Sequence, residues 1–470
     1  MPNAKQIRPG VWEFKEEGMN VPGRIYATEK LFPSIEDGVF KQVSNVAKLP
    51  GIQKASMAMP DAHYGYVFPI GGVAAFSMDQ GIISPGGVGY DINCGVRLMT
   101  TDLSVKDVKP KLSQLIDELF DNVPSGLGSK SRLKASETQL KEACVEGAGW
   151  AVSEGYGTEE DLLHTEEEGC IEGADTSAIS RRAMDRGRPQ IGTLGSGNHF
   201  LEVQQVDKIY DSEVAKKYGI NSLGQITVMI HCGSRGLGYQ VADDYIAVML
   251  AAARKYSINL PDNELACSPL NSKEAQDYIK AMYCAVNYAF CNRQMIAHWV
   301  RETLRGIFDD CEVKQVYDIC HNIAKFEEHK DVGKVCVHRK GATRAFAAGR
   351  REIPETYRDV GQPVIIPGDM GTASYVLVGT QTAMDETFGS VCHGAGRVMS
   401  RTKATHTVRG EEVKKRLEAK GQVVRADSWK VLSEEAPEAY KDIDEVIRSV
   451  ELAGLSKPIV RLTPLGVAKG

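Results

Sequence analysis

Apolar residues recur at two different spacings along this chain. In residues 20–100, short apolar runs alternate with glycine-rich stretches, which is typical of strands joined by tight turns. Between residues 104 and 122 the apolar positions, among them Leu115, Ile116 and Leu119, fall on one face of a helix. The pattern therefore predicts strands within residues 20–100, followed by a helix over residues 104–122.

The centre of the chain contains both kinds of element. Residues 135–185 are polar and predict helices and loops, as expected of an insertion. Ile226–Ile230 is a continuous apolar run that predicts a buried strand leading directly into His231. Ser272 is a suitable N-cap for a long helix that reaches to about Phe308.

The last part of the chain predicts a short strand at Val364–Ile366 and a charged helix at Glu411–Lys420. No Pro/Ser-rich linker divides the sequence. We therefore predict an α+β fold, a single large domain over residues 1–470 with mixed β-sheets and a helical insertion at about 104–185. A division into two domains is the alternative.

Composition restricts the classes of function. A chain of 470 residues with 42% hydrophobic content can bury a large core. The net charge of −6 means that any nucleic-acid binding depends on local basic patches. The eleven cysteines include no CxxC pair, the N-terminus has no apolar signal region, and the longest apolar run, Tyr245–Ala253, is too short for a bilayer. We expect a cytoplasmic protein with reduced thiols and no membrane association; in a eukaryotic cell the nucleus is a second location.

The candidate chemistry lies in glycine-rich turns. The sequence has no GxxxxGK[ST], HExxH or GxSxG motif, which argues against a P-loop, a zincin and a serine hydrolase. Five of the ten histidines share the glycine-rich setting: His63, His199, His231, His321 and His393. The others lie in helical or charged stretches; His298 is expected inside the long helix and His329 on a solvated face.

One set of these residues has the chemistry of a metal centre. It comprises one carboxylate, one thiolate and three imidazoles, from Asp91, Cys94, His199, His231 and His321. Five ligands are too many for one tetrahedral ion but suit two ions that share the thiolate. Mixed oxygen, nitrogen and sulfur donors leave Zn²⁺, Mn²⁺ and Fe²⁺ open.

A second set has the chemistry of a phosphate site. The turns PGDMGTAS and HGAGR expose backbone N–H groups, and Arg97, Arg235 and Arg397 lie in such turns. His393 is not needed to complete the metal set. A neutral imidazole is a competent nucleophile toward phosphorus, and the small residues after it would let a phosphorylated group approach.

Eight stretches together strongly resemble the RtcB family of RNA ligases, in family order from about residue 50 to the last residue. They are MPDAHYGY, SPGGVGYDINCGVR, GSGNHFLE, HCGSRGLG, HNIAK, PGDMGTASY, HGAGR and a C-terminal Lys-Gly. The resemblance implies a GTP- and Mn²⁺-dependent ligase that joins a 2′,3′-cyclic phosphate or 3′-phosphate RNA end to a 5′-hydroxyl end. It also implies RNA partners, either tRNA halves or broken RNA, and an archease-type activator in members that need one.

The resemblance also implies roles for individual residues. His393 would take guanylate from GTP. One Mn²⁺ would bind Asp91, Cys94 and His199, and a second would bind Cys94, His231 and His321. The GMP pocket would comprise Asn198, His199, Glu202, His321, Asn322, Pro367, Gly368, Asp369, Met370, Ser374, His393, Gly394, Ala395, Gly396, Tyr440 and Lys469. Candidates for RNA phosphates are Arg186, Arg188, Arg235, Arg397 and Arg401. The carboxylate of Asp369 would repel a nucleotide unless it pairs or points away.

Two other classes of function compete with a ligase. A dinuclear metallohydrolase would use the five metal donors but gives no role to the HGAGR turn or to Lys469. A non-enzymatic RNA- or nucleotide-binding scaffold explains neither the donors nor His393. The discriminating feature is therefore a covalent role for His393.

Overall fold

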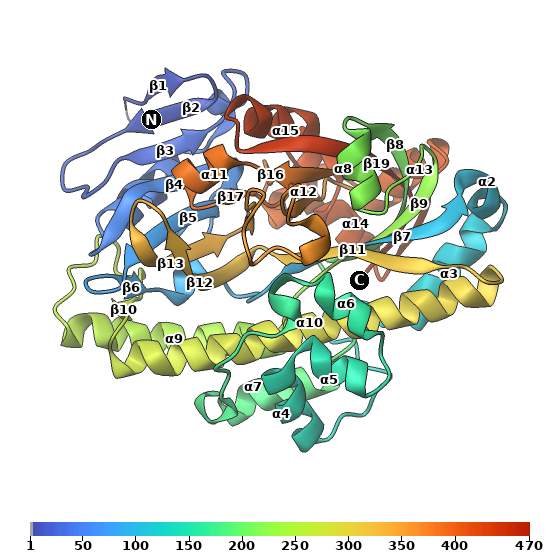
Figure 1. Ribbon diagram of the computed structural model, residues 1–470, viewed down its shortest axis with the longest axis horizontal. Helices are drawn as coiled ribbons and strands as arrows, with labels where there is room; N and C mark the ends of the chain where they lie inside the picture. Colours follow the sequence, from blue (N-terminus) through green and yellow to red (C-terminus); the bar gives the residue numbers. More distant parts are fainter. Residues whose placement is uncertain (1–2) are drawn as a thin grey trace.

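The computed structural model describes residues 3–470 and contains two large sheets in that range (Figure 1). One sheet has seven strands in the order β1 (Lys5–Arg8), β2 (Val11–Phe14), β3 (Gly23–Tyr26), β4 (Ile52–His63), β5 (Ile70–Ser77), β13 (Gly333–Lys340) and β12 (Asn322–His329). Its pairs are antiparallel except β3–β4. This sheet therefore joins the N-terminal region to a hairpin from the second half of the chain.

The other large sheet has eight strands. Its order is β11 (Val313–Cys320), β7 (Gly95–Ser104), β9 (Gln225–Cys232), β8 (Phe200–Ile209), β19 (Ser456–Lys469), β16 (Ser374–Gly379) and β15 (Pro363–Ile366), and β18 (Val423–Ala426) pairs parallel to β19. Two small ladders pair β6 (Ile82–Ile83) with β10 (Ser268–Pro269) and β14 (Ala342–Arg344) with β17 (Ser390–Cys392). Several neighbours in these sheets, such as β7 and β11 or β8 and β19, lie far apart in sequence.

Helices surround the sheets and differ greatly in length. They are α1 (Asp37–Ala47), α2 (Val105–Val108), α3 (Leu112–Asn122), α4 (Glu137–Glu146), α5 (Ala148–Ser153), α6 (Glu159–Leu163), α7 (Arg181–Gly187), α8 (Ser212–Lys217), α9 (Arg235–Lys255), α10 (Lys273–Ile307), α11 (Gln381–Thr387), α12 (Arg401–Thr407), α13 (Gly410–Ala419), α14 (Trp429–Glu434) and α15 (Ile443–Leu452). Within residues 3–470, no helix combines the length and apolarity that a bilayer crossing requires.

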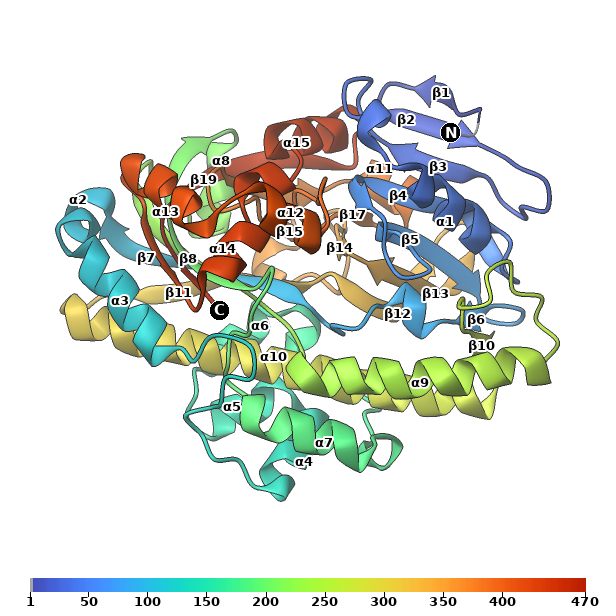
Figure 2. The same ribbon diagram turned by 180° about the vertical axis from the view of Figure 1, so that it is seen from behind.

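The two longest helices form a layer of their own. Helices α9 and α10 lie side by side below the sheets, and α4, α5 and α7 lie on the far side of this pair (Figures 1 and 2). Most of α10 is buried, because it packs on β9 above and on α4 and α5 below. The polar side chains of α10 must therefore find partners inside the protein.

The α+β fold class is confirmed, and most predicted elements are present. The predicted strand at 226–230 is β9, the helix from Ser272 is α10, and the Ser272 hydroxyl accepts a hydrogen bond from the Ala275 N–H at 3.1 Å. Helical structure also occupies 137–187. The predicted helix at 104–122 is divided into α2 and α3, because Pro110 lies between them in a short 3₁₀ turn.

Candidate functional site

Strand pairing brings the predicted metal donors together. Strand β7 begins at Gly95, which pairs with Cys320 of β11. The residues just outside this pair, Cys94 and His321, meet there, and the His321 N–H donates to the Cys94 carbonyl at 2.8 Å. His231 of β9 faces the same point. A side chain at Gly95 would collide with the backbone of β11, so this close approach requires glycine.

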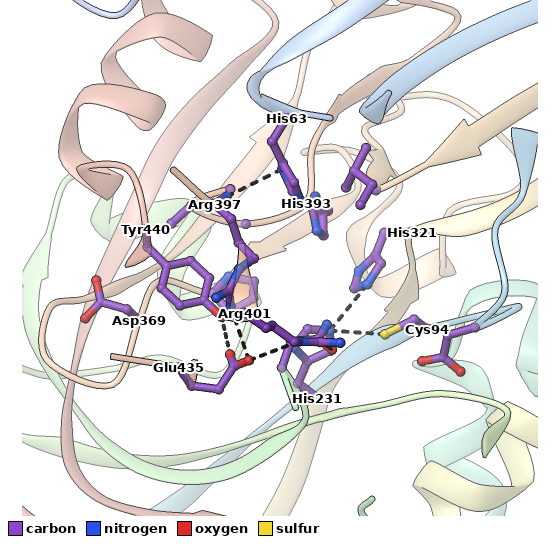
Figure 3. Close-up of a pocket in the computed structure, with 18 of the residues that line it drawn as sticks. His63, Cys94, His231, His321, Asp369, His393, Arg397, Arg401, Glu435 and Tyr440 are labelled. Carbon is purple, nitrogen blue, oxygen red and sulfur yellow. Dashed lines mark hydrogen bonds and ion pairs between the residues drawn. The ribbon is translucent and has the colours of Figure 1, made fainter. Parts of the chain in front are cut away.

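The five predicted donors form two groups that share Cys94. Figure 3 shows one of them, the group of Cys94, His231 and His321. The Cys94 Sγ lies 3.2 Å from His231 Nε2 and 3.5 Å from His199 Nε2. The two Nε2 atoms of His231 and His321 are 3.3 Å apart, and His199 Nε2 is 2.8 Å from an Asp91 carboxylate oxygen. In each group the ligand atoms lie within 4.8 Å of one another. Cys94 is therefore the residue common to both groups.

The chemistry of this cluster fits metal binding. Burial would raise the pKa of Asp91, but the charge and hydrogen bond of His199, together with the Cys94 hydrogen bond and the charge of Arg235, outweigh burial and lower that pKa to about 2, so the carboxylate is charged. Burial, together with this carboxylate, raises the pKa of the Cys94 thiol to about 12. Burial lowers the pKa of His231, which keeps that imidazole neutral and able to bind metal. A bound cation would reverse the penalty on the thiolate, since a coordinated thiol is deprotonated.

Helix α10 fixes the backbone of the donor loops through Arg293. This guanidinium is fully buried and donates to the carbonyl oxygens of Asn93 and Cys232, each at 2.8 Å. It also donates to both carboxylate oxygens of Asp318. Asn93 precedes Cys94 and Cys232 follows His231, so one side chain holds two ligand segments in register.

A cavity of about 800 Å³ opens beside the donors. The predicted residues in its wall are Asp91, Cys94, Asn198, Glu202, His231, His321, Asn322, Pro367, Gly368, Asp369, Met370, His393, Gly394, Ala395, Gly396, Tyr440 and Lys469. Two of the residues predicted for the metal groups or the GMP pocket, His199 and Ser374, are not part of the wall. His199 contacts Asp91, and the Ser374 hydroxyl accepts from the Gly368 N–H at 3.3 Å and supports the turn from behind.

His393 is held by Asp61, at the end of β4. Its Nδ1 lies 2.5 Å from an Asp61 carboxylate oxygen, which also accepts the backbone N–H of His393 at 3.0 Å. Because an ionised carboxylate only accepts hydrogen bonds, this contact favours the tautomer with its proton on Nδ1 and its lone pair on Nε2. The ring centroid of His393 is 4.7 Å from that of His321, yet His393 belongs to neither donor group. The histidine is thus oriented beside the metal donors.

The small residues after His393 allow this contact. Gly396 has a φ of +74°, and a Cβ there would lie 2.0 Å from the Asp61 carbonyl oxygen. On the other side of the strand, the Lys441 ammonium donates to the carbonyls of Pro60 and Ala62 at 3.0 and 2.6 Å. The HGAGR turn therefore needs glycine to lie against β4, and Lys441 fixes the strand that carries Asp61.

Away from the metal donors, ionisable and aromatic groups line the cavity. Glu202 of β8 is buried, which raises its pKa to about 8. Lys469 of β19 donates to the Gly197 carbonyl at 2.9 Å and lies 3.5 Å from the Glu435 carboxylate. The Tyr440 hydroxyl donates to the same carboxylate (Figure 3). One acceptor, one cationic donor and one aromatic ring therefore face a common space.

The remaining predicted groups separate into two sets. The Asp369 carboxylate accepts from the Gly371 N–H at 2.8 Å and the Thr372 hydroxyl at 2.7 Å, so it is paired within its own turn.

Arg397 and Arg401 line the cavity and contact Glu435 at 3.2 and 3.6 Å. The other candidates for RNA phosphates, Arg186, Arg188 and Arg235, are not in the wall.

Comparison with known proteins identifies the family. The family model described as tRNA-splicing ligase RtcB matches residues 42–470. The chain belongs to the RtcB family. A protein named tRNA-splicing ligase RtcB from Archaeoglobus fulgidus is 59% identical over 99% of this chain and 98% of its own length. Relatives with the same name from Thermococcus kodakarensis and Methanococcus maripaludis are 56% and 54% identical, over 99% and 96% of this chain and 98% and 95% of their own lengths.

Two residues of this RtcB-family site were assigned no role from the sequence. Asp61 lies in a quoted motif, but nothing local indicates that it contacts His393, 332 positions away. Glu435 lies in a charged stretch that resembles a solvent-exposed helix end, although the structure buries it among Arg397, Lys469 and Tyr440. The Asp61 contact and the contacts of Glu435 with Arg397 and Lys469 join residues that are distant in sequence.

Proposed function

We propose that this protein is a GTP- and Mn²⁺-dependent RNA ligase that joins a 3′-phosphate or 2′,3′-cyclic phosphate end to a 5′-hydroxyl end. The observation that carries the proposal is the position of His393, whose free Nε2 lies beside the metal donors but outside them. Family membership and the name of the relatives support ligation of RNA, with tRNA halves or broken RNA as substrates. A hydrolase would not need an imidazole oriented in this way.

The first step is transfer of guanylate to the protein. The lone pair of His393 Nε2 attacks the α-phosphorus of GTP, so an N–P bond forms and the bond to the leaving pyrophosphate breaks. The imidazole gains positive charge, and the Nδ1–H bond to the Asp61 carboxylate stabilises that charge. Arg397 and Arg401, which line the same cavity, would contact phosphate oxygens.

The later steps transfer the guanylate to RNA. Water opens a cyclic phosphate to a 3′-phosphate, whose oxygen takes the guanylate from His393 and gives an RNA–ppG end. The 5′-hydroxyl of the second RNA then attacks the 3′-phosphorus and GMP leaves. Each step exchanges one bond at phosphorus, so no oxidant or reductant is needed.

The metal would be Mn²⁺ at both donor groups, held by Asp91, Cys94 and His199 and by Cys94, His231 and His321. Bound ions would offset the negative charge of the phosphates. The mixed donor set fits Mn²⁺ without requiring it. Support for this choice comes from family membership.

Replacement of Asp61 by asparagine should slow guanylylation by at least about 100-fold. An asparagine amide can donate to Nδ1 and so move the proton to Nε2, where it blocks the nucleophile; the equivalent change in a serine protease costs on the order of 10⁴-fold. The measurement is the rate of label transfer from α-phosphate-labelled GTP. Asp385→Asn, on the exposed face of α11, is the matched control, and metal content should be equal in both. Equal labelling rates in the two variants would refute the orienting role.

Replacement of Glu202 by glutamine should weaken discrimination for guanine. The purine amide and amino N–H groups are donors that a carboxyl oxygen accepts, and Lys469 can donate to the guanine oxygen. Because burial raises the pKa of Glu202 to about 8, this carboxyl group is mostly protonated at neutral pH. A hydrogen bond between neutral groups contributes about 0.5–1.5 kcal/mol, so the GTP concentration for half-maximal labelling should rise by about 2- to 10-fold. Glu213→Gln on exposed α8 is the control. If the GTP concentration for half-maximal labelling did not change, the guanine base would not bind at Glu202.

A further inference from the structure

A line of aromatic side chains leads out of the cavity. We call Tyr66, Tyr90 and Tyr239 the tyrosine row. The rings of Tyr90 and Tyr239 are stacked, with centroids 4.9 Å apart and planes at 26°. Tyr66 continues the row at 5.7 Å from Tyr90. Two of the three, Tyr66 and Tyr90, line the cavity that contains His393, and Tyr239 lies outside it on α9. The row therefore connects the cavity with the outer surface.

Basic side chains lie at both ends of the tyrosine row. The Arg186 guanidinium of α7 lies 4.9 Å from the ring of Tyr239, and Lys340 Nζ of β13 lies 6.0 Å from the ring of Tyr66. Arg186 is exposed and donates to the neutral amide oxygen of Gln240 at 2.9 Å. An exposed guanidinium paired with a neutral group keeps its charge available for an anion.

The tyrosine rings of the row are partly exposed to solvent, and packing within the protein does not require this exposure. Tyr239 is 45% exposed, and Tyr66 and Tyr90 are partly exposed. Five chain segments supply the row and its basic side chains: α7, the start of α9, the turn before Asp91, the β4–β5 connection and β13. Helices α7 and α9 lie together in both views (Figures 1 and 2). Clustered exposed aromatic rings beside a catalytic cavity are typical of a binding surface.

We propose that the tyrosine row stacks the bases of a single-stranded RNA end as that end enters the cavity, while Arg186 contacts its phosphates. This inference rests on the proposed function. Aromatic rings bind any base through its π face, so such a surface suits RNA ends of different sequence. Asp243, one turn of α9 after Tyr239, is exposed and repels phosphate. The backbone should therefore lie on the Arg186 side.

Replacement of Tyr239 by alanine should raise the RNA concentration needed for half-maximal ligation by about 5- to 150-fold, because one base–ring stack contributes about 1–3 kcal/mol. Tyr239→Phe should retain near-normal affinity, since the ring remains. Tyr239→Leu keeps bulk without a π face and should behave like the alanine variant. Tyr256→Ala, at the other end of α9, is the matched control and should match the unsubstituted protein.

Fluorescence tests stacking directly. Two oligonucleotides are compared, one with 2-aminopurine near a 3′-phosphate end and one with 2-aminopurine near a 5′-hydroxyl end. The comparison also shows which of the two RNA ends binds to the tyrosine row. Stacking should quench at least one probe on the unsubstituted protein and on Tyr239→Phe, and the quench should be lost in Tyr239→Ala and Tyr239→Leu. Arg186→Ala should weaken binding and lower the salt dependence by about one charge.

The outcomes separate this inference from the proposed function. An unsubstituted protein that takes no label from GTP would overturn the ligase proposal. A protein that labels and ligates, with equal quenching and equal RNA requirement in the Tyr239 variants, would overturn the stacking surface alone.

Discussion

Replacing His393 with alanine should abolish covalent transfer of guanylate from GTP to the protein. The imidazole Nε2 is the nucleophile in the proposed mechanism, and removing the nucleophile of a covalent enzyme lowers turnover by on the order of 10⁶-fold. The assay is incubation with Mn²⁺ and GTP labelled in the α-phosphate, followed by a denaturing gel. The unsubstituted protein should carry an acid-labile label and the variant none.

The control for this prediction is His406→Ala, which removes an exposed histidine of α12. This variant should label at the normal rate. Since His393 belongs to neither donor group, the His393→Ala protein should also keep its full metal content. Normal labelling of His393→Ala would exclude the histidine mechanism, and loss of metal would mean that His393 is a ligand.

Replacing Cys94 with alanine should remove both metal ions and, with them, all labelling. The thiolate belongs to both donor groups, so one substitution takes a ligand from each. Loss of a residue that only supports a metal ligand costs about 10- to 100-fold in affinity, and loss of a shared ligand should exceed that. Titration with Mn²⁺, followed by metal analysis, measures the change.

Cys170→Ala is the matched control, because Cys170 is partly exposed and lies outside the donor groups. It should bind two metal ions per chain and label normally. A Cys94→Ala protein with two bound ions and full labelling would refute the bridging thiolate. A variant that keeps one ion would show that the two groups bind independently.

The sequence predicted the parts of the fold whose signals are local. The apolar run before His231 and the capped helix from Ser272 are long and regular, and both are present. The predicted pattern of residues 20–100 contained strands only, yet α1 lies among them with its apolar face against β4. The apolar run Tyr245–Ala253 is part of α9. Only some of the residues of this helix are buried.

Long-range contacts account for what the sequence could not predict. His329 was expected on a solvated face but is buried, because β12 pairs with β13. His329 Nε2 lies 3.1 Å from a Glu327 carboxylate oxygen. The prediction for His329 was wrong. Asp61 and Glu435 likewise gain their partners only when distant segments meet. Residue type and the glycine-rich setting singled out the candidate donors, and the family resemblance divided them into two groups. The structure brings these residues together, and metal binding by them stays a prediction.

The position of the guanylate on the protein tests the central claim most directly. The unsubstituted protein is incubated with GTP and Mn²⁺, digested under alkaline conditions that preserve N–P bonds, and its peptides are sequenced by mass spectrometry. We expect one guanylyl group, on the His393 imidazole. Guanylate on a lysine such as Lys469, or hydrolysis of GTP with no adduct at His393, would contradict the account.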